Sequence, residues 1–151
     1  GGILPAAPVN GETKKVLISL SDKDNLKGQS LDIARAFSYL GFKILATDGT
    51  AKFFAENGIN AEKISKINEG RPNVLDVILN REVCLCINTP SARRGVIKDE
   101  ETIRKAALKY KIPYITTLAG AKAAVDGIGT ARSGKGGVKS LQDYHSQIKN
   151  V

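Results

Sequence analysis

Two threonines bracket an Asp-Gly pair in the stretch ILATDGTAKFF, residues 44–54. An apolar run precedes the pair and the first turn of a helix should follow it, so Thr47 and Thr50 stand at a strand-to-helix junction. Hydroxyls and free backbone amides at a helix start, here around Gly49, together form a site for an anion such as phosphate. Taken alone, each threonine is more commonly a helix cap, so the other junctions have to be compared with this one.

Polar and basic side chains also gather at the ends of the other predicted strands. Lys23 and Lys27 follow the first strand in SDKDNLK, and Lys66 and Arg71 lie in SKINEGRP at the end of the third. The junction after the fourth strand holds three further polar residues, which are Asn88, Thr89 and Ser91. Ligands of parallel sheets bind at the edge where the carboxyl ends of the strands meet. The convergence of these donors at one edge therefore predicts a phosphate cradle.

The elements that must position these residues alternate regularly along the chain. Short apolar runs predict strands at 16–21, 43–47, 62–67, 83–88 and 112–117. Helical periodicity and capping residues predict helices at 26–40, 51–58, 72–80, 99–111, 119–128 and 140–148. Repeated strand–helix units with short loops predict an α/β fold, a three-layer, doubly wound parallel sheet of the Rossmann or flavodoxin type.

Composition restricts the class of partner. The 151 residues are enough for one domain with a real core, at 42% hydrophobic and 25% charged residues. The net charge of +8 is scattered along the chain and aromatic residues make up only 5%. This pattern favours a small phosphorylated ligand or an acidic partner over nucleic acid. No apolar run reaches the length of a membrane span, and no signal peptide is recognisable.

The two cysteines do not indicate a metal site. Cys84 and Cys86 point to the same side of an extended run, and the single histidine, His145, is remote in sequence. We therefore expect small hydrophobic residues in a buried strand, with reduced thiols as in the cytoplasm.

The stretch GTARSGKGG resembles the phosphate-binding loop G-x-x-x-x-G-K. A functional loop of that type follows a strand and carries Ser or Thr after the lysine. Here a helix precedes Gly129, and Gly136 follows Lys135 where the hydroxyl is needed. We interpret this stretch as an ordinary loop.

The first fourteen residues differ from the rest. They are rich in Gly, Pro and Ala without apolar periodicity, and the chain begins Gly-Gly and contains no Met. We expect residues 1–14 to be a linker from a preceding domain of a longer polypeptide, and residues 15–151 to be one domain.

Several of these stretches resemble a known family. They are ATDGTAKFF, SKINEGRPNVLDVI, CINTPSARRG, ETIRKAALKYKIPYITTLAGAKA and LQDYHSQIK. Together they are similar to the carboxyl-terminal regulatory domain of the carbamoyl-phosphate synthetase large subunit, from about Val16 to Lys149. The resemblance implies that residues 15–151 have the methylglyoxal-synthase-like fold and form a regulatory, nucleotide-binding domain. It implies that the parent enzyme is a cytoplasmic, ATP-dependent ligase that uses Mg or Mn. It also implies synthetase domains of the same chain and a small glutaminase subunit as partners, and a role in pyrimidine and arginine biosynthesis. The domain itself would hold no cofactor and no metal.

The resemblance also assigns residues. A nucleotide monophosphate effector such as UMP or IMP would contact Lys27, Thr47, Gly49, Thr50, Lys66, Asn88, Thr89 and Ser91. The first-loop lysine has no clean counterpart, so Lys23 stays an alternative to Lys27. Ornithine, where it binds, would contact Tyr114 and Thr116 near the interface with the synthetase body.

Catalysis is the alternative function. Methylglyoxal synthase and IMP cyclohydrolase share the fold, and the stretch SLSDKDNL is similar to the latter. Methylglyoxal synthase needs an aspartate base where this chain has Arg71, and a second acid where Thr89 precedes Pro90. Without a base, proton abstraction from carbon has no agent. We therefore expect regulation rather than catalysis, with a standalone enzyme on a phosphorylated substrate as the alternative.

Overall fold

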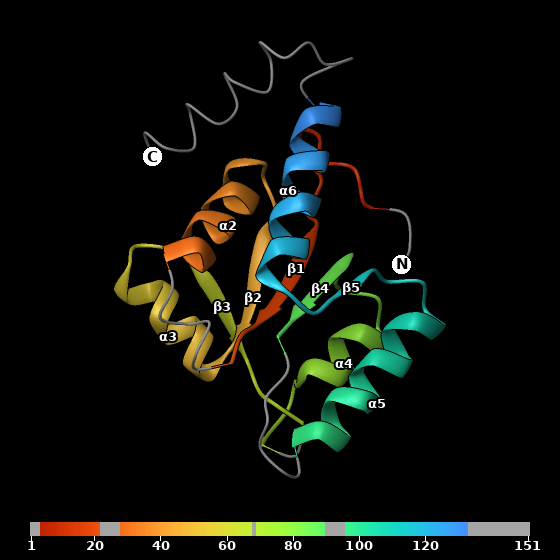
Figure 1. Ribbon diagram of the computed structural model, residues 1–151. Coiled ribbons are helices and arrows are strands. Elements are labelled where there is room, and N and C mark those ends of the chain that lie inside the picture. Colours follow the sequence, from red (N-terminus) through yellow and green to blue (C-terminus); the bar gives the residue numbers. More distant parts are fainter. Residues whose placement is uncertain (1–3, 22–27, 68, 90–95, 133–151) are drawn as a thin grey trace.

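The computed structural model describes residues 4–21, 28–67, 69–89 and 96–132 (Figure 1). Five parallel strands form one sheet in the order β3-β2-β1-β4-β5. The strands are β1 (Lys15–Ser19), β2 (Lys43–Thr47), β3 (Ala61–Ile64), β4 (Leu85–Asn88) and β5 (Tyr114–Ile115). The helices are α2 (Gly28–Tyr39), α3 (Asp48–Glu56), α4 (Val74–Leu79), α5 (Val96–Lys109) and α6 (Leu118–Arg132).

Helices cover both faces of the sheet, which confirms the predicted three layers. On one face, Phe37 of α2, Phe54 of α3 and Val125 of α6 pack in one cluster with Val16. On the other face, α4 and α5 pack over Leu17 and its neighbours. Alternate residues of a strand point to opposite faces, so an apolar run such as VLI in β1 supplies both clusters.

The chain reverses its winding at β1. From β1 it proceeds to β2 and β3 on one side, then crosses to β4 and β5 on the other. Side chains at the carboxyl ends of β1 and β4 flank this switch point, and Ser19 pairs in register with Asn88. In doubly wound sheets the crevice at the switch point is the usual ligand site.

Helix α3 begins three residues earlier than predicted. Thr47 occupies its N-cap position with extended backbone, but the Thr47 side chain makes no capping hydrogen bond. Asp48 lies in the first turn, where a carboxylate interacts favourably with the helix dipole. The Asp-Gly pair is therefore helical and does not form a turn.

Helix α4 begins later than predicted, because Asn73 rather than Pro72 starts it. The Asn73 side chain accepts a hydrogen bond from the Asp76 amide, and the Asp76 carboxylate accepts one from the Asn73 amide. This capping box satisfies two backbone donors at the helix start.

The segment that was predicted to be a linker lies against the domain in its described part. Residues 4–14 contain no helix or strand, and the Lys14 ammonium donates to the Ala6 carbonyl at 2.9 Å. The Leu4 side chain lies near Gly127 of α6, and Pro8 lies near Gly41. The segment therefore reaches β1 along the amino ends of the strands.

Other sequence predictions fall partly outside the described residues. Residues 129–132 of GTARSGKGG continue α6, so a helix occupies the place where a phosphate loop needs a strand. Gly134, Lys135, Gly136, His145 and the predicted helix 140–148 lie outside the described residues. Within the described ranges, no helix is both long and apolar enough to cross a bilayer.

Candidate anion-binding pocket

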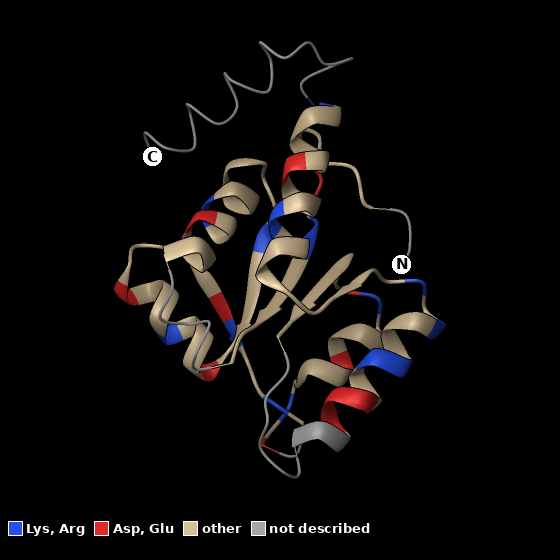
Figure 2. Ribbon diagram, in the orientation of Figure 1, with Lys and Arg blue, Asp and Glu red and all other residues tan. Residues whose placement is uncertain are grey.

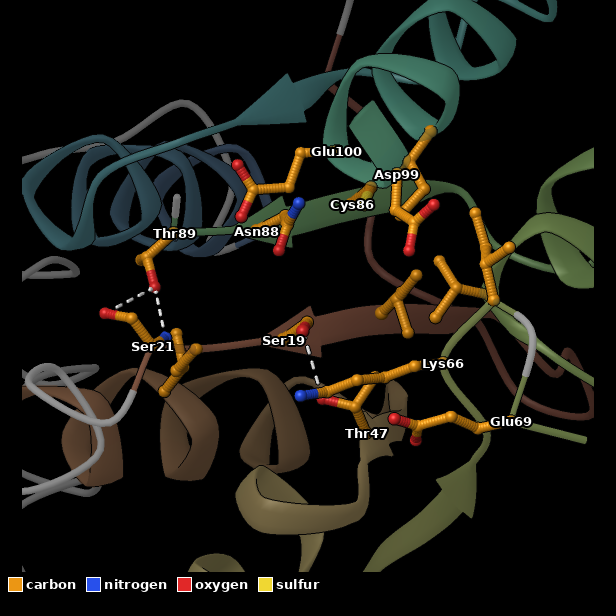
Figure 3. Close-up of a pocket in the computed structure, with 15 residues that line it drawn as sticks. Ser19, Ser21, Thr47, Lys66, Glu69, Cys86, Asn88, Thr89, Asp99 and Glu100 are labelled. Atoms are coloured by element: carbon orange, nitrogen blue, oxygen red, sulfur yellow. Dashed lines mark hydrogen bonds between the residues drawn. The ribbon is translucent and has the colours of Figure 1, made fainter. Parts of the chain in front are cut away.

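A pocket of about 260 Å³ opens at the carboxyl ends of β1, β2 and β4 (Figure 3). Its apolar lining consists of Leu17, Leu20, Ile67, Val74, Cys86 and Ile103. Its polar lining consists of Ser19, Ser21, Thr47, Lys66, Glu69, Asn88, Thr89, Asp99 and Glu100. Residues from both sides of the topological switch therefore meet in one cavity.

A pair of hydroxyls forms one wall. Ser19 Oγ and Thr47 Oγ1, at the ends of neighbouring strands, lie 3.0 Å apart. Two hydroxyls carry two protons, and their mutual hydrogen bond uses only one of them. The second proton is available to an acceptor in the pocket.

Contacts between Thr89 and Ser21 connect the ends of β1 and β4. Thr89 Oγ1 accepts the Ser21 backbone N–H at 2.7 Å and lies 3.5 Å from Ser21 Oγ. Because the Thr89 hydroxyl accepts a hydrogen bond from this amide, the Thr89 side chain is held in place at the edge of the pocket.

Lys66 supplies the positive charge. Its ammonium makes no hydrogen bond or ion pair with any described residue, and Figure 3 shows it reaching toward Thr47 and Ser19. A positive charge beside hydroxyl donors attracts a phosphate. The two described hydroxyls and this ammonium form the part of the pocket best suited to an anion.

Three carboxylates also line the pocket, and sequence reasoning missed them. Glu69 comes from the loop after β3, Asp99 comes from the first turn of α5, and Glu100 follows Asp99 in the same helix. Acidic residues such as Asp99 and Glu100 near a helix start are typical of interaction with the helix dipole, so the sequence carried no separate sign of a place in a pocket. Carboxylates accept hydrogen bonds, so a ligand here should carry donors as well as an anion.

The charges around the pocket are mixed. Figure 2 shows both acidic and basic residues on α3 and α6, and on α5 acidic residues near its start with basic residues after them. Three predicted contacts lie outside the described residues, namely Lys23, Lys27 and Ser91.

Two other predicted ligand contacts do not line the pocket. Thr50 is 1% exposed, and its Oγ1 accepts the Leu20 backbone N–H at 3.0 Å. Gly49 lies beside it in the first turn of α3. Asp48 forms an ion pair with Lys63 at 3.1 Å, outside the lining. The structure therefore gives Thr50 a bond within the fold, whereas Thr47 faces the cavity.

The two predicted ornithine contacts lie just outside the pocket. The Tyr114 hydroxyl accepts a hydrogen bond from Asn88 Nδ2 at 2.7 Å, and Thr116 is exposed beyond the end of β5. Burial raises the pKa of the Tyr114 phenol, although the hydrogen bond from Asn88 opposes that shift. The phenol therefore keeps its proton at neutral pH.

Arg71 is absent from the pocket lining. Its guanidinium lies 2.7 Å from the Asp76 carboxylate and is largely exposed. The hydrogen bond from Arg71 lowers the pKa of Asp76, and the bond from the Asn73 amide adds to the effect. Arg71, which stands where methylglyoxal synthase needs its aspartate base, therefore binds Asp76 and holds the loop in place.

Cys86 is buried in β4, as predicted, whereas Cys84 precedes the strand, is only partly buried and packs against the cluster on the opposite face. Both thiols are free, and burial raises the pKa of Cys86 to about 12. Cys84 donates a hydrogen bond to the Lys15 carbonyl at 3.3 Å. No cluster of three or more His, Cys, Asp or Glu residues suited to a metal occurs in the part of the chain that the structure describes.

Sequence reasoning also missed two serines. Ser19 and Ser21 line the pocket, but the first strand was expected to continue through residue 21. The strand ends at Ser19, so both hydroxyls fall at its carboxyl end. A strand boundary placed two residues earlier would have found them.

Comparison with known proteins identifies the family. A family model described as the MGS-like domain matches residues 29–116, more than half of the chain. The chain belongs to the MGS-like domain family. The match includes β2 to β5 of this MGS-like domain, and with them Thr47, Lys66 and Asn88 of the pocket.

Relatives of this MGS-like domain are parts of much larger proteins. The carbamoyl phosphate synthase large chain of Archaeoglobus fulgidus is 51% identical over 132 residues, covering 87% of this chain and 12% of that protein. The C-terminal section of the same large chain in Methanopyrus kandleri is 44% identical over 129 residues, covering 85% of this chain and 23% of that section. This chain therefore spans about an eighth of the full-length relative and about a quarter of that section.

A solved structure shares the fold. The crystal structure of ForH matches with a TM-score of 0.50, covering 92% of this chain and 91% of that chain, at 16% sequence identity. At this identity the likeness concerns the fold alone.

Proposed function

We propose that this MGS-like domain is the regulatory, nucleotide-binding domain of a carbamoyl phosphate synthase large chain. The single observation that carries the proposal is the Lys66 ammonium, which has no partner among the described residues and lies beside the hydroxyls of Ser19 and Thr47. The sequence identity to carbamoyl phosphate synthase large chains supports the proposal that the parent protein is such a large chain.

The effector would be a nucleoside monophosphate such as UMP or IMP. Its phosphate dianion would lie on Thr47, Ser19 and Lys66, and its remaining groups would face Asn88 and Thr89. Lys27 (or Lys23) and Ser91 stay predicted contacts, as do the amide of Gly49 and the hydroxyl of Thr50. Hydrogen bonds to a charged group contribute about 1.5–3 kcal/mol each, so three or four of them reach micromolar affinity after association costs.

Regulation would require that the effector prefers one arrangement of the domain against the rest of the enzyme. An effector shifts an equilibrium only by its difference in affinity for the two states. The partners would be the synthetase domains of the same chain, which use ATP with Mg or Mn, and a small glutaminase subunit. Ornithine bound near Tyr114 and Thr116 would act through the same equilibrium, in a cytoplasmic enzyme that serves pyrimidine and arginine biosynthesis.

Calorimetric titration of the 151-residue chain with UMP and with IMP tests the proposal. We expect micromolar binding of at least one nucleotide, and a loss of about ten- to a hundredfold in Lys66→Gln. Lys122→Gln on α6, an exposed lysine that pairs with Asp126, is the matched control and should bind as the parent chain does. Absence of binding at millimolar nucleotide, or equal affinity in Lys66→Gln, contradicts the proposal.

The pocket carboxylates favour a second candidate, a standalone enzyme of the methylglyoxal synthase or IMP cyclohydrolase type. Glu69 and Asp99 make no ion pair with a described residue, and either could act as a base. Incubation with dihydroxyacetone phosphate and an assay for methylglyoxal distinguishes the candidates. Turnover of dihydroxyacetone phosphate near an ordinary ~10 s⁻¹ would contradict the regulatory proposal and support the catalytic one.

A further inference from the structure

Tyr114 contacts the pocket without lining it. It lies on β5, the edge strand beyond β4, and its hydroxyl accepts the hydrogen bond from Asn88 Nδ2 at 2.7 Å. Asn88 lines the pocket and is only 7% exposed. The orientation of a buried pocket amide therefore depends on a residue outside the pocket.

The hydrogen bond leaves one atom of the amide unused. Asn88 Oδ1 has no hydrogen-bond partner among the described residues, and in Figure 3 it points toward the side where Ser19 lies. A buried carbonyl oxygen without a partner is unfavourable, so this position calls for a donor. A phosphate oxygen, which is itself an acceptor, does not satisfy it.

The anion site lies one strand away. Ser19 pairs in register with Asn88 across β1 and β4, and neighbouring strands are about 4.8 Å apart. Ser19 in turn shares a hydrogen bond with Thr47 beside Lys66. The pocket thus offers donors for an anion and, about one strand spacing away, an acceptor for a hydroxyl or N–H group.

We infer that Tyr114 is a positioning residue that turns the Asn88 carbonyl into the pocket, where it selects phosphorylated ligands that carry a sugar hydroxyl. This inference rests on the proposed function for the phosphate end of the ligand. It assigns Asn88 to the sugar rather than to the phosphate. It also makes the Tyr114 hydroxyl part of effector selectivity, in addition to any contact with ornithine.

The test compares each nucleotide with an analogue that lacks the hydroxyls. UMP and IMP are titrated beside their 2′,3′-dideoxy counterparts into the parent chain, Tyr114→Phe and Asn88→Ala. In the parent chain we expect the ribonucleotide to bind about three- to tenfold tighter than its dideoxy analogue. In both variants this ratio should fall toward one, because ribonucleotide affinity drops while dideoxy affinity is retained.

Each contrary outcome has a separate meaning. A ratio of one in the parent chain, or an unchanged ratio in Tyr114→Phe and Asn88→Ala, overturns the inference and leaves the proposed function intact. Equal weakening of both ligands in the two variants identifies a purely structural role and also overturns it. Failure of the parent chain to bind any of the four compounds refutes the proposed function and this inference with it.

Tyr110→Phe is the matched control. Tyr110 follows α5 at the amino end of β5, and its ring contacts the Arg81 guanidinium at 5.2 Å from the ring centroid. It is absent from the pocket lining. The selectivity ratio in Tyr110→Phe should equal that of the parent chain, and a collapse there would overturn the assignment to Tyr114.

Discussion

At the scale of single residues, two threonines of one short stretch have different surroundings. Thr47 faces the pocket and shares a hydrogen bond with Ser19, whereas Thr50 points into the core and accepts the Leu20 amide. Three positions along a chain that turns from a strand into a helix are enough to reverse the direction of a side chain. Thr50 therefore contributes to stability, and its predicted contact with the effector stays a prediction.

We expect Thr50→Val to destabilise the fold. Valine retains the shape but removes the acceptor of the buried Leu20 N–H, which costs about 1–3 kcal/mol. Urea unfolding of the two proteins, followed by circular dichroism, measures the difference. The slope of the transition should stay unchanged, because the folded states bury the same surface.

Thr130→Val on α6 is the control for this change. The Thr130 hydroxyl donates to the Asp126 carbonyl one turn earlier, so its loss leaves no buried amide without a partner. We expect a much smaller effect on the free energy of unfolding. Equal losses in the two variants would contradict the assigned role of Thr50.

At the scale of elements, the loop after β3 and helix α4 form one hydrogen-bonded unit that carries Lys66. Ser65 accepts the Val74 amide at 2.9 Å, and Ser65 and Asn73 form a bridge in parallel orientation. Asp76 caps the helix and binds Arg71. The ends of the loop are thereby fixed on both sides of the pocket lysine.

The Asp76 carboxylate should make this unit sensitive to acid. Its pKa is lowered in the folded chain, first by Arg71 and then by the Asn73 amide. The stabilisation is therefore complete above the ordinary aspartate pKa near 3.9 and is lost as the pH falls through the lower folded value. We expect the difference in unfolding free energy between the parent chain and Asp76→Asn to be constant from pH 5 to 8 and to shrink below about pH 4.

Asp32→Asn provides the comparison for the acid titration. Asp32 is exposed on α2, where it forms an ion pair with Arg35 at 3.8 Å. Its replacement should change stability little at any of these pH values, as exposed ion pairs contribute little. A difference for Asp76→Asn that stays constant down to pH 3 would contradict the role assigned to that carboxylate.

The order and type of the elements were predictable from the sequence, and their ends were less so. Apolar runs such as VLI and LCI identify buried strands because both faces of a parallel sheet are covered. The start of α4 depends on the capping box between Asn73 and Asp76. The prediction placed it at Pro72, because proline is common in the first helical position. The start of α3 was set too late because Asp-Gly is more typical of a turn than of a first helical turn.

At the scale of the whole molecule, the reversal of winding at β1 produces the pocket. It places β1 between β2 and β4, so Thr47, Ser19 and Asn88 end side by side at one edge of the sheet. The sequence predicted this convergence because the rule for parallel sheets needs only the strand ends. It could not predict Glu69 or Asp99 in the lining, since their directions depend on how α5 and a loop pack against the sheet.

The same topology separates the pocket from the amino-terminal segment. Residues 4–14 approach along the amino ends of the strands, and the pocket opens at the carboxyl ends. In the proposed enzyme, contacts made at the edge of the pocket would change when the effector binds.

The most direct test of the central claim is a crystal structure of the chain grown with UMP or IMP at saturating concentration. We expect the phosphate within hydrogen-bonding distance of Lys66 Nζ and of the Ser19 or Thr47 hydroxyl, with the sugar toward Asn88. A bound nucleotide whose phosphate lies elsewhere, or a pocket without nucleotide under those conditions, would contradict the account.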